Sequence, residues 1–76
     1  MSTQDFPKRL PEKLTAIRER MRLSPDEFAL RLGAKDGAEI LSYENDTGEL
    51  SVRMLFRYAA AAGIPFENII EDDRDL

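Results

Sequence analysis

The segment from Ser24 to Gly33 carries the clearest helix boundary signals in the chain, and these limit what the chain can fold into. Ser24 precedes a proline, and Glu27 follows three residues after the serine, a spacing typical of a capping box at a helix start. Gly33 suits the left-handed conformation that often ends a helix. The sequence therefore predicts a short helix over 25–32.

Apolar residues at helical spacing, separated by turn residues, predict four further helices over 10–22, 37–45, 52–62 and 65–70. No segment alternates as a strand does. For the helix over 52–62, the spacing predicts a buried face formed by Val52, Leu55, Phe56, Ala59 and Gly63. Five short helices with short connections indicate a compact all-α five-helix domain over 10–70. We expect a flexible arm over 1–9 and an acidic, frayed tail over 71–76.

Composition excludes several classes of function. The 76 residues are 42% hydrophobic and 34% charged, as in a globular chain with room for one core. Cysteine and histidine are both missing, which excludes disulfides, thiolate or imidazole metal sites, and catalysis by these residues. We expect no enzyme activity, no cofactor and no metal. No apolar run approaches the roughly 20 residues of a membrane span, so we expect no membrane partner and a cytoplasmic location.

The charges are distributed unevenly along the chain. The net charge is −4, yet residues 1–35 hold eight Lys or Arg against five acids. Residues 67–76 hold five acids against one Arg, and the remainder is neutral overall. The acidic end has two interpretations: a solvated end of the chain, or a segment that binds a partner or repels DNA.

Four short motifs stand in an order similar to that of a known family. They are Leu14-x-x-Ile17-Arg18, Leu23-Ser24-x-x-Glu27-Phe28-Ala29-x-x-Leu32-Gly33, Ile40-x-x-Tyr43-Glu44-Asn45, and Ser51-Val52-x-x-Leu55-x-x-Tyr58-Ala59 followed by Gly63-Ile64. On these motifs, the segment 10–70 resembles the phage-repressor (Cro and cI, or XRE) helix-turn-helix family. The resemblance implies a lambda-repressor-like fold and a small regulator of transcription that binds duplex DNA.

The resemblance also implies which residues contact DNA. The third helix of such proteins enters the major groove, and the start of the second helix contacts a phosphate. The positions that this assigns to DNA contact are Ser24, Asp26, Lys35, Gly37, Ala38, Glu39, Ser42, Asn45, Thr47 and Arg53. In the arm, Lys8 and Arg9 are further candidates for phosphate contact.

The chain departs from the family pattern around the third helix. Pro25 stands where glutamine is common, Asp46 stands where glycine is common, and the stretch from Gly33 to Tyr43 is one residue longer. The base-reading positions of the third helix are Asp36, Gly37, Ala38, Glu39, Leu41 and Ser42. Two of them are acids, which phosphates repel, although a carboxylate can accept a hydrogen bond from cytosine. Two functions therefore stay open. One is a DNA-binding regulator, and the other is a protein-interaction module of the adaptor or antitoxin type.

Two further expectations concern structure and assembly. The family pattern pairs Arg18 with Glu44, and we interpret this pair as structural. The apolar residues at the end of the chain have two interpretations, closing the core or forming a two-fold contact in a homodimer: Ile64, Phe66, Ile69 and Ile70. Both tyrosines fit core positions with their hydroxyls at the solvent.

Overall fold

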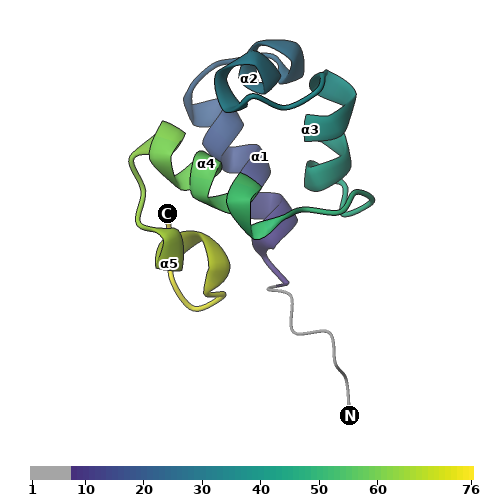
Figure 1. The fold of residues 1–76 in the computed structure, drawn as a ribbon. Coiled ribbons are helices and arrows are strands. Elements are labelled where there is room, and N and C mark those ends of the chain that lie inside the picture. The colour runs from purple at the N-terminus through teal and green to yellow at the C-terminus, as the bar shows by residue number, and fades with distance from the viewer. Residues whose placement is uncertain (1–7) are drawn as a thin grey trace.

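The computed structural model describes residues 8–76, and within this range the chain forms five α-helices and no strand (Figure 1). The helices are α1 (Leu10–Arg20), α2 (Pro25–Leu32), α3 (Gly37–Glu44), α4 (Val52–Ala62) and α5 (Phe66–Ile70). The predicted all-α five-helix domain is confirmed. α2 and α4 have the predicted bounds, and the other three helices are one or two residues shorter. No helix in the described part is long and apolar enough to cross a membrane.

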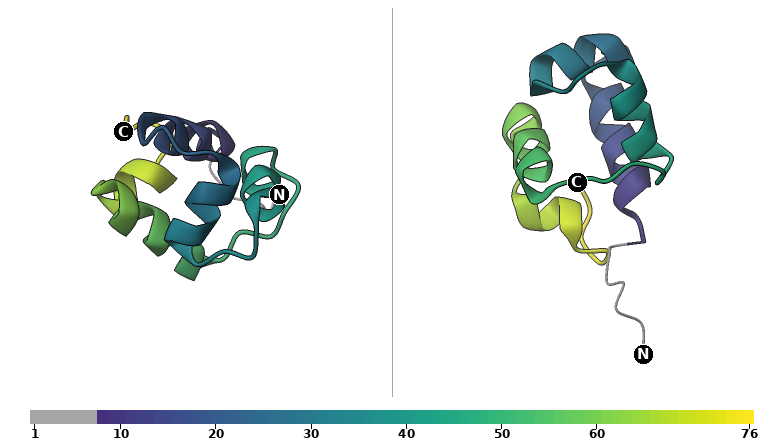
Figure 2. Two further views of the ribbon diagram at one scale, coloured as in Figure 1. Left: turned by 90° about the horizontal axis from the view of Figure 1, so that it is seen from above. Right: turned by 45° about the vertical axis from the view of Figure 1, so that its right-hand side comes forward.

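The helices are arranged so that α3 lies at one edge of the molecule. α1 packs against α3, α4 and α5, whereas α3 packs on α1 and most extensively on α2. In Figures 1 and 2, α3 and α5 lie on opposite sides of the molecule, with α1 and α4 between them. One face of α3 is therefore left uncovered by the rest of the domain.

All five helices contribute to a single apolar core. Its centre is the contact between Phe28 and Tyr58, whose ring centroids lie 5.2 Å apart in an edge-to-face arrangement. The hydroxyl of Tyr58 is buried and has no hydrogen-bond partner within residues 8–76. The expectation that this hydroxyl meets the solvent was wrong, because the Tyr58 side chain points into the core rather than along its edge.

The buried face of α4 differs from the one that the spacing predicted. Met54, Leu55 and Tyr58 are buried, whereas Val52 is 62% and Phe56 54% exposed. α4 carries apolar residues around most of its circumference, so periodicity alone did not fix its rotation. Phe56 stacks instead on Phe66 of α5, with ring centroids 4.4 Å apart.

The C-terminal residues 71–76 are held against α1, so the fraying predicted for this tail is not what the structure shows. The carboxylate of Asp72 accepts hydrogen bonds from the backbone N–H groups of Lys8 and Arg9, and Leu76 packs against the core. Lys8 and Arg9 thus form a fixed turn, whereas the rest of the predicted arm, residues 1–7, lies outside the described residues.

The four apolar residues at the end of the chain do not share one environment. Ile69 is completely buried in the core and is not available to a second chain. The other three pack against the core but keep part of their surface at the solvent: Ile64, Phe66 and Ile70.

Candidate nucleic-acid interface

α2 is a short helix with defined ends, and this sets where the chain turns toward α3. The Ser24 hydroxyl accepts a hydrogen bond from the Glu27 N–H at 3.1 Å, and the Glu27 carboxylate accepts one from the Ser24 N–H at 2.8 Å. Gly33 adopts φ +74°, a conformation that costs glycine little. The predicted capping box is confirmed, and the Ser24 side chain, predicted to contact DNA, serves as the cap of α2.

A direct contact between Asp26 and Gly37 joins the starts of α2 and α3. The Asp26 carboxylate accepts a hydrogen bond from the Gly37 N–H at 2.9 Å. A Cβ atom at position 37 would overlap this carboxylate and lie 2.9 Å from the Asp26 backbone nitrogen. Both residues were predicted to contact DNA, and the structure gives them an internal role in setting the distance between the helices.

Glu39, the acidic residue predicted to read a base, has both carboxylate oxygens engaged within the protein. One accepts a hydrogen bond from the Lys35 N–H at 2.7 Å, and the other accepts one from the Tyr43 hydroxyl. These hydrogen bonds lower the pKa of Glu39. Burial, together with the bond to Glu39, raises the pKa of Tyr43 to about 12. Glu39 therefore fastens the turn before α3 to the middle of that helix.

Ser42 and Thr47 fasten the other end of α3 to the loop that follows it. The Ser42 hydroxyl donates to the Glu39 carbonyl at 2.6 Å, and the Ser42 carbonyl accepts from the N–H groups of Thr47 and Gly48 at 2.8 and 3.1 Å. A side chain at Gly48 would overlap the Ser42 hydroxyl. Both Ser42 and Thr47 were predicted to contact DNA, and their hydroxyls already have partners inside the protein.

The outer face of α3 is formed by three residues spaced by a helical turn, Ala38, Leu41 and Asn45, all of them exposed. This face carries no charge. Lys35 and Arg53 are also exposed, and the structure gives their side chains no polar partner within residues 8–76. Of the ten residues predicted to contact DNA, Lys35, Ala38, Asn45 and Arg53 are thus the ones whose side chains are free to meet a ligand.

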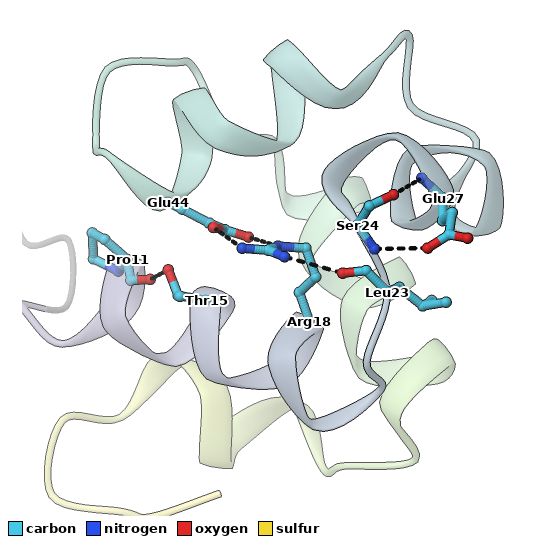
Figure 3. Close-up of polar contacts among 7 residues, drawn as sticks. All are labelled: Pro11, Thr15, Arg18, Leu23, Ser24, Glu27 and Glu44. Atoms are coloured by element: carbon cyan, nitrogen blue, oxygen red, sulfur yellow. Dashed lines mark hydrogen bonds and ion pairs between the residues drawn. The ribbon is translucent and has the colours of Figure 1, made fainter.

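An ion pair between Arg18 and Glu44 holds α3 on α1 (Figure 3). The Arg18 guanidinium donates to both Glu44 oxygens, at 2.7 and 3.1 Å, and to the Leu23 carbonyl at 3.0 Å. The hydrogen bond to Glu44 raises the pKa of Arg18 despite the opposing effect of burial. The geometry is that of the structural pair expected from the sequence, and it also fixes the link between α1 and α2.

Arg57 of α4 forms a second polar link, which was not predicted from the sequence. Its guanidinium donates to the Leu32 carbonyl at 3.1 Å, at the last residue of α2. A basic side chain near a helix C-terminus is a favourable arrangement, but a partner 25 residues away leaves no local sequence signal. Arg57 thereby attaches α2 to α4 on the side opposite to its contact with α3.

A cavity of about 430 Å³ lies between the start of α1 and the loop after α3. Its lining residues are Lys8, Leu10, Pro11, Tyr43, Asp46, Gly48, Glu49 and Leu50. This cavity could not be predicted from the sequence, because its walls come from segments more than thirty residues apart. It places the basic start of α1 beside the end of α3.

The surface around α3 therefore combines an uncharged helix face with two free cations and several acids at its edges. Asp36 caps the start of α3, and Asp46 and Glu49 lie in the loop beyond its end. No family model matches the chain, and comparisons with curated proteins and with solved structures found no match.

Proposed function

We propose that this protein binds duplex DNA as a regulator of transcription, with the outer face of α3 in the major groove, as its resemblance to the phage-repressor helix-turn-helix family implies. The observation that carries the proposal is the placement of α3. It stands at the edge of the domain, is held by α1 and α2, and presents an uncovered face of Ala38, Leu41 and Asn45. A major groove accepts one α-helix with such a face.

Each free side chain has a role in this arrangement. Asn45 offers the amide that pairs with adenine, and Ala38 and Leu41 offer apolar contact to thymine methyl groups. Lys35 and Arg53 flank α3 and supply phosphate contacts, which give affinity without sequence preference. The internal bonds of Glu39 occupy both of its carboxylate oxygens, so this proposal gives Glu39 no contact to a base.

The test is fluorescence anisotropy with a labelled duplex from the DNA upstream of the gene and with a random duplex, across a salt series. Phosphate contacts predict a log K that falls linearly with log salt, by about 0.9 per contact. Lys35→Gln and Arg53→Gln should each reduce that slope by about 0.9. Asn45→Ala should lower the preference for the upstream duplex, by about 1–3 kcal/mol for a lost bidentate contact.

The matched control is Arg31→Gln, which also removes one exposed positive charge. Arg31 lines a shallow depression with Arg57 and Ala60, between α2 and α4 and away from α3. The slope of log K against log salt for Arg31→Gln should equal that of the wild type. Equal slopes for Arg31→Gln and the two α3-flanking variants, or no binding of either duplex at low salt, would contradict the proposal.

A protein-interaction module of the adaptor or antitoxin type is the second candidate function. The observation that favours it is the lack of any cation on the outer face of α3, together with Leu30 of α2, which is 84% exposed. If neither duplex binds at low salt, this candidate replaces the first. A protein partner would then bury Leu41, and Leu41→Asp should abolish its binding.

We further propose that the protein forms a homodimer through Val52, Phe56 and Phe66, the apolar patch at the junction of α4 and α5. The exposed apolar surface supports it: Val52 and Phe56 are 62% and 54% exposed, and Phe56 stacks on Phe66. A dimer of this kind would read half-sites about 34–36 Å apart.

The mass in sedimentation equilibrium tests the dimer. Phe56→Glu should convert a dimer to a monomer without loss of helical circular dichroism, because Phe56 is more than half exposed. The control is Leu30→Glu, which places the same charge at an exposed leucine outside the patch and should leave the mass unchanged. A monomeric wild type at hundreds of micromolar would contradict the dimer.

A further inference from the structure

The start of α1 is capped from the other end of the chain. α1 has no side-chain cap of its own, because the Arg9 side chain at its N-cap position makes no such bond. Instead, the Asp72 carboxylate accepts the Lys8 and Arg9 N–H groups, each at 2.9 Å. A carboxylate at a helix start satisfies free N–H groups and complements the helix dipole.

α1 caps the end of α5 in return. The Lys13 side chain is 2% exposed, and its ammonium donates to the carbonyls of Asn68 and Glu71 at 2.6 and 2.7 Å. Those carbonyls belong to the last turn of α5 and the residue after it. α1 and the C-terminal end of α5 are thus joined by the bonds of Asp72 and by those of Lys13. These bonds hold the segment that begins at Glu71 close to the side chain of Arg9.

The C-terminal segment also occupies the Arg9 guanidinium. One nitrogen donates to the Asp72 carbonyl at 2.7 Å, and another meets the Asp75 carboxylate at 3.2 Å. The Arg9 side chain is still 39% exposed. Lys8, its neighbour, lines the cavity beside the loop after α3. Arg9 and Lys8 would otherwise extend a basic surface next to α3. The Arg9 side chain is bound by Asp75, and the Asp72 carboxylate lies against the backbone of Lys8.

We propose that residues 71–76 act as an intramolecular latch that competes with the phosphates of a polyanion for Arg9 and the adjoining Lys8. The Asp72 carboxylate holds the segment on the backbone N–H groups of Lys8 and Arg9, and the Asp72 carbonyl and the Asp75 carboxylate occupy the Arg9 guanidinium. A carboxylate and a phosphate both accept charge-assisted hydrogen bonds from arginine, so a phosphate that binds the Arg9 nitrogen held by Asp75 has to displace that carboxylate. The latch does not depend on DNA binding. Its effect on DNA affinity rests on the proposed function.

Retention on immobilised heparin, measured as the salt concentration at elution, tests the latch without any specific DNA sequence. The latch variant is Asp72→Ala/Asp75→Ala, and its control is Glu67→Ala/Asp73→Ala. Each removes two exposed carboxylates, but Glu67 and Asp73 make no side-chain bond within residues 8–76. The latch variant should elute at higher salt than the control. Adding Arg9→Gln should return it to the control position.

A single variant keeps Asp72, and with it the cap of α1, so that a change in elution cannot come from unfolding of α1. Asp75→Ala removes a contact of the Arg9 side chain only, because Asp75 is 93% exposed and touches no backbone N–H of α1. It should elute later than Asp73→Ala, with an unchanged circular dichroism spectrum. If the latch variants and their controls elute at the same salt concentration, the latch is overturned. The same holds if none of them is retained.

The fluorescence anisotropy titration with DNA duplexes distinguishes failure of the latch from failure of the proposed function. With the latch open, one or two additional phosphate contacts should steepen the log K against log salt slope by about 0.9–1.8 relative to the control double variant. Later elution from heparin without any duplex binding supports the latch and overturns the proposed DNA binding. Duplex binding with equal slopes in both double variants overturns the latch and leaves the proposed function standing.

Discussion

At the residue scale, the two tyrosines show how one side chain type serves opposite purposes. Tyr43 donates its hydroxyl hydrogen to Glu39 within α3, and the same carboxylate accepts the Lys35 N–H of the preceding turn. Tyr58 fills the centre of the core with its ring, and its hydroxyl has no partner within residues 8–76. A buried hydroxyl that lacks a partner costs about 1–3 kcal/mol, so the two hydroxyls should have opposite effects on stability.

We expect Tyr58→Phe to raise the free energy of unfolding by about 1 kcal/mol, since it removes an unpaired buried polar group and keeps the ring. Tyr43→Phe should lower it by about 1–2 kcal/mol, because it deletes a hydrogen bond to a charged acceptor. Urea unfolding followed by circular dichroism measures both. Equal losses in the two variants would contradict the difference in bonding.

At the element scale, the sequence predicted helix boundaries better than helix orientation. Ser24 and Gly33 fix the ends of α2 through local chemistry, so the bounds of α2 could be predicted. The rotation of α4 could not, because it depends on which apolar face meets α1 and α2. Lys13 was missed for a similar reason. The burial of Lys13 depends on its contacts with α5, which the local sequence does not show. The sequence signal for it is position: Lys13 lies on the same helix face as Leu10, Leu14 and Ile17.

The ion pair between α1 and α3 is the contact between elements whose loss should matter most. The Arg18 and Glu44 side chains are only 15% and 5% exposed, so removing one strands the other. Arg18→Met or Glu44→Leu alone should cost about 3–5 kcal/mol. The double variant should cost less than either single one. If chemical unfolding instead gives a double-variant cost equal to the sum of the two singles, the pair is not coupled.

At the scale of the whole molecule, the structure leaves an exposed face on α3, the helix predicted to enter the groove, and it bonds most of the side chains predicted to contact DNA within the protein. A family resemblance assigns positions, but it carries no information on local hydrogen bonds. Asp26, Gly37, Glu39 and Ser42 are therefore predicted to contact DNA from the sequence, yet all four have partners inside the structure. That Lys35, Asn45 and Arg53 touch DNA stays a prediction.

The joined ends of the molecule predict a specific loss of stability in acid. Hydrogen bonds from the Arg9 and Lys8 N–H groups lower the pKa of Asp72 below its ordinary value of 3.8. A carboxyl whose pKa is lower in the folded state stabilises the fold above its unfolded pKa, and this contribution is lost as the pH falls through the folded value.

The Tm of Asp72→Asn should therefore lie below that of the wild type at pH 7, and the gap should close below about pH 3.8. The control is Asp73→Asn, which removes the same charge one residue away and should show a smaller gap at pH 7. A gap that persists unchanged at pH 2 would show that Asp72 acts through something other than its charge.

The capping of α1 by Asp72 has a consequence for how the protein is made. On the ribosome, α1 emerges first, but its cap lies 63 residues after Arg9. At about 5–20 residues per second, that delay is about 3–13 s. An 11-residue helix is marginal in water on its own. The bonds that close the start of α1 therefore form only after Asp72 has been translated, whereas α1 can already pack on α3 and α4 before that point.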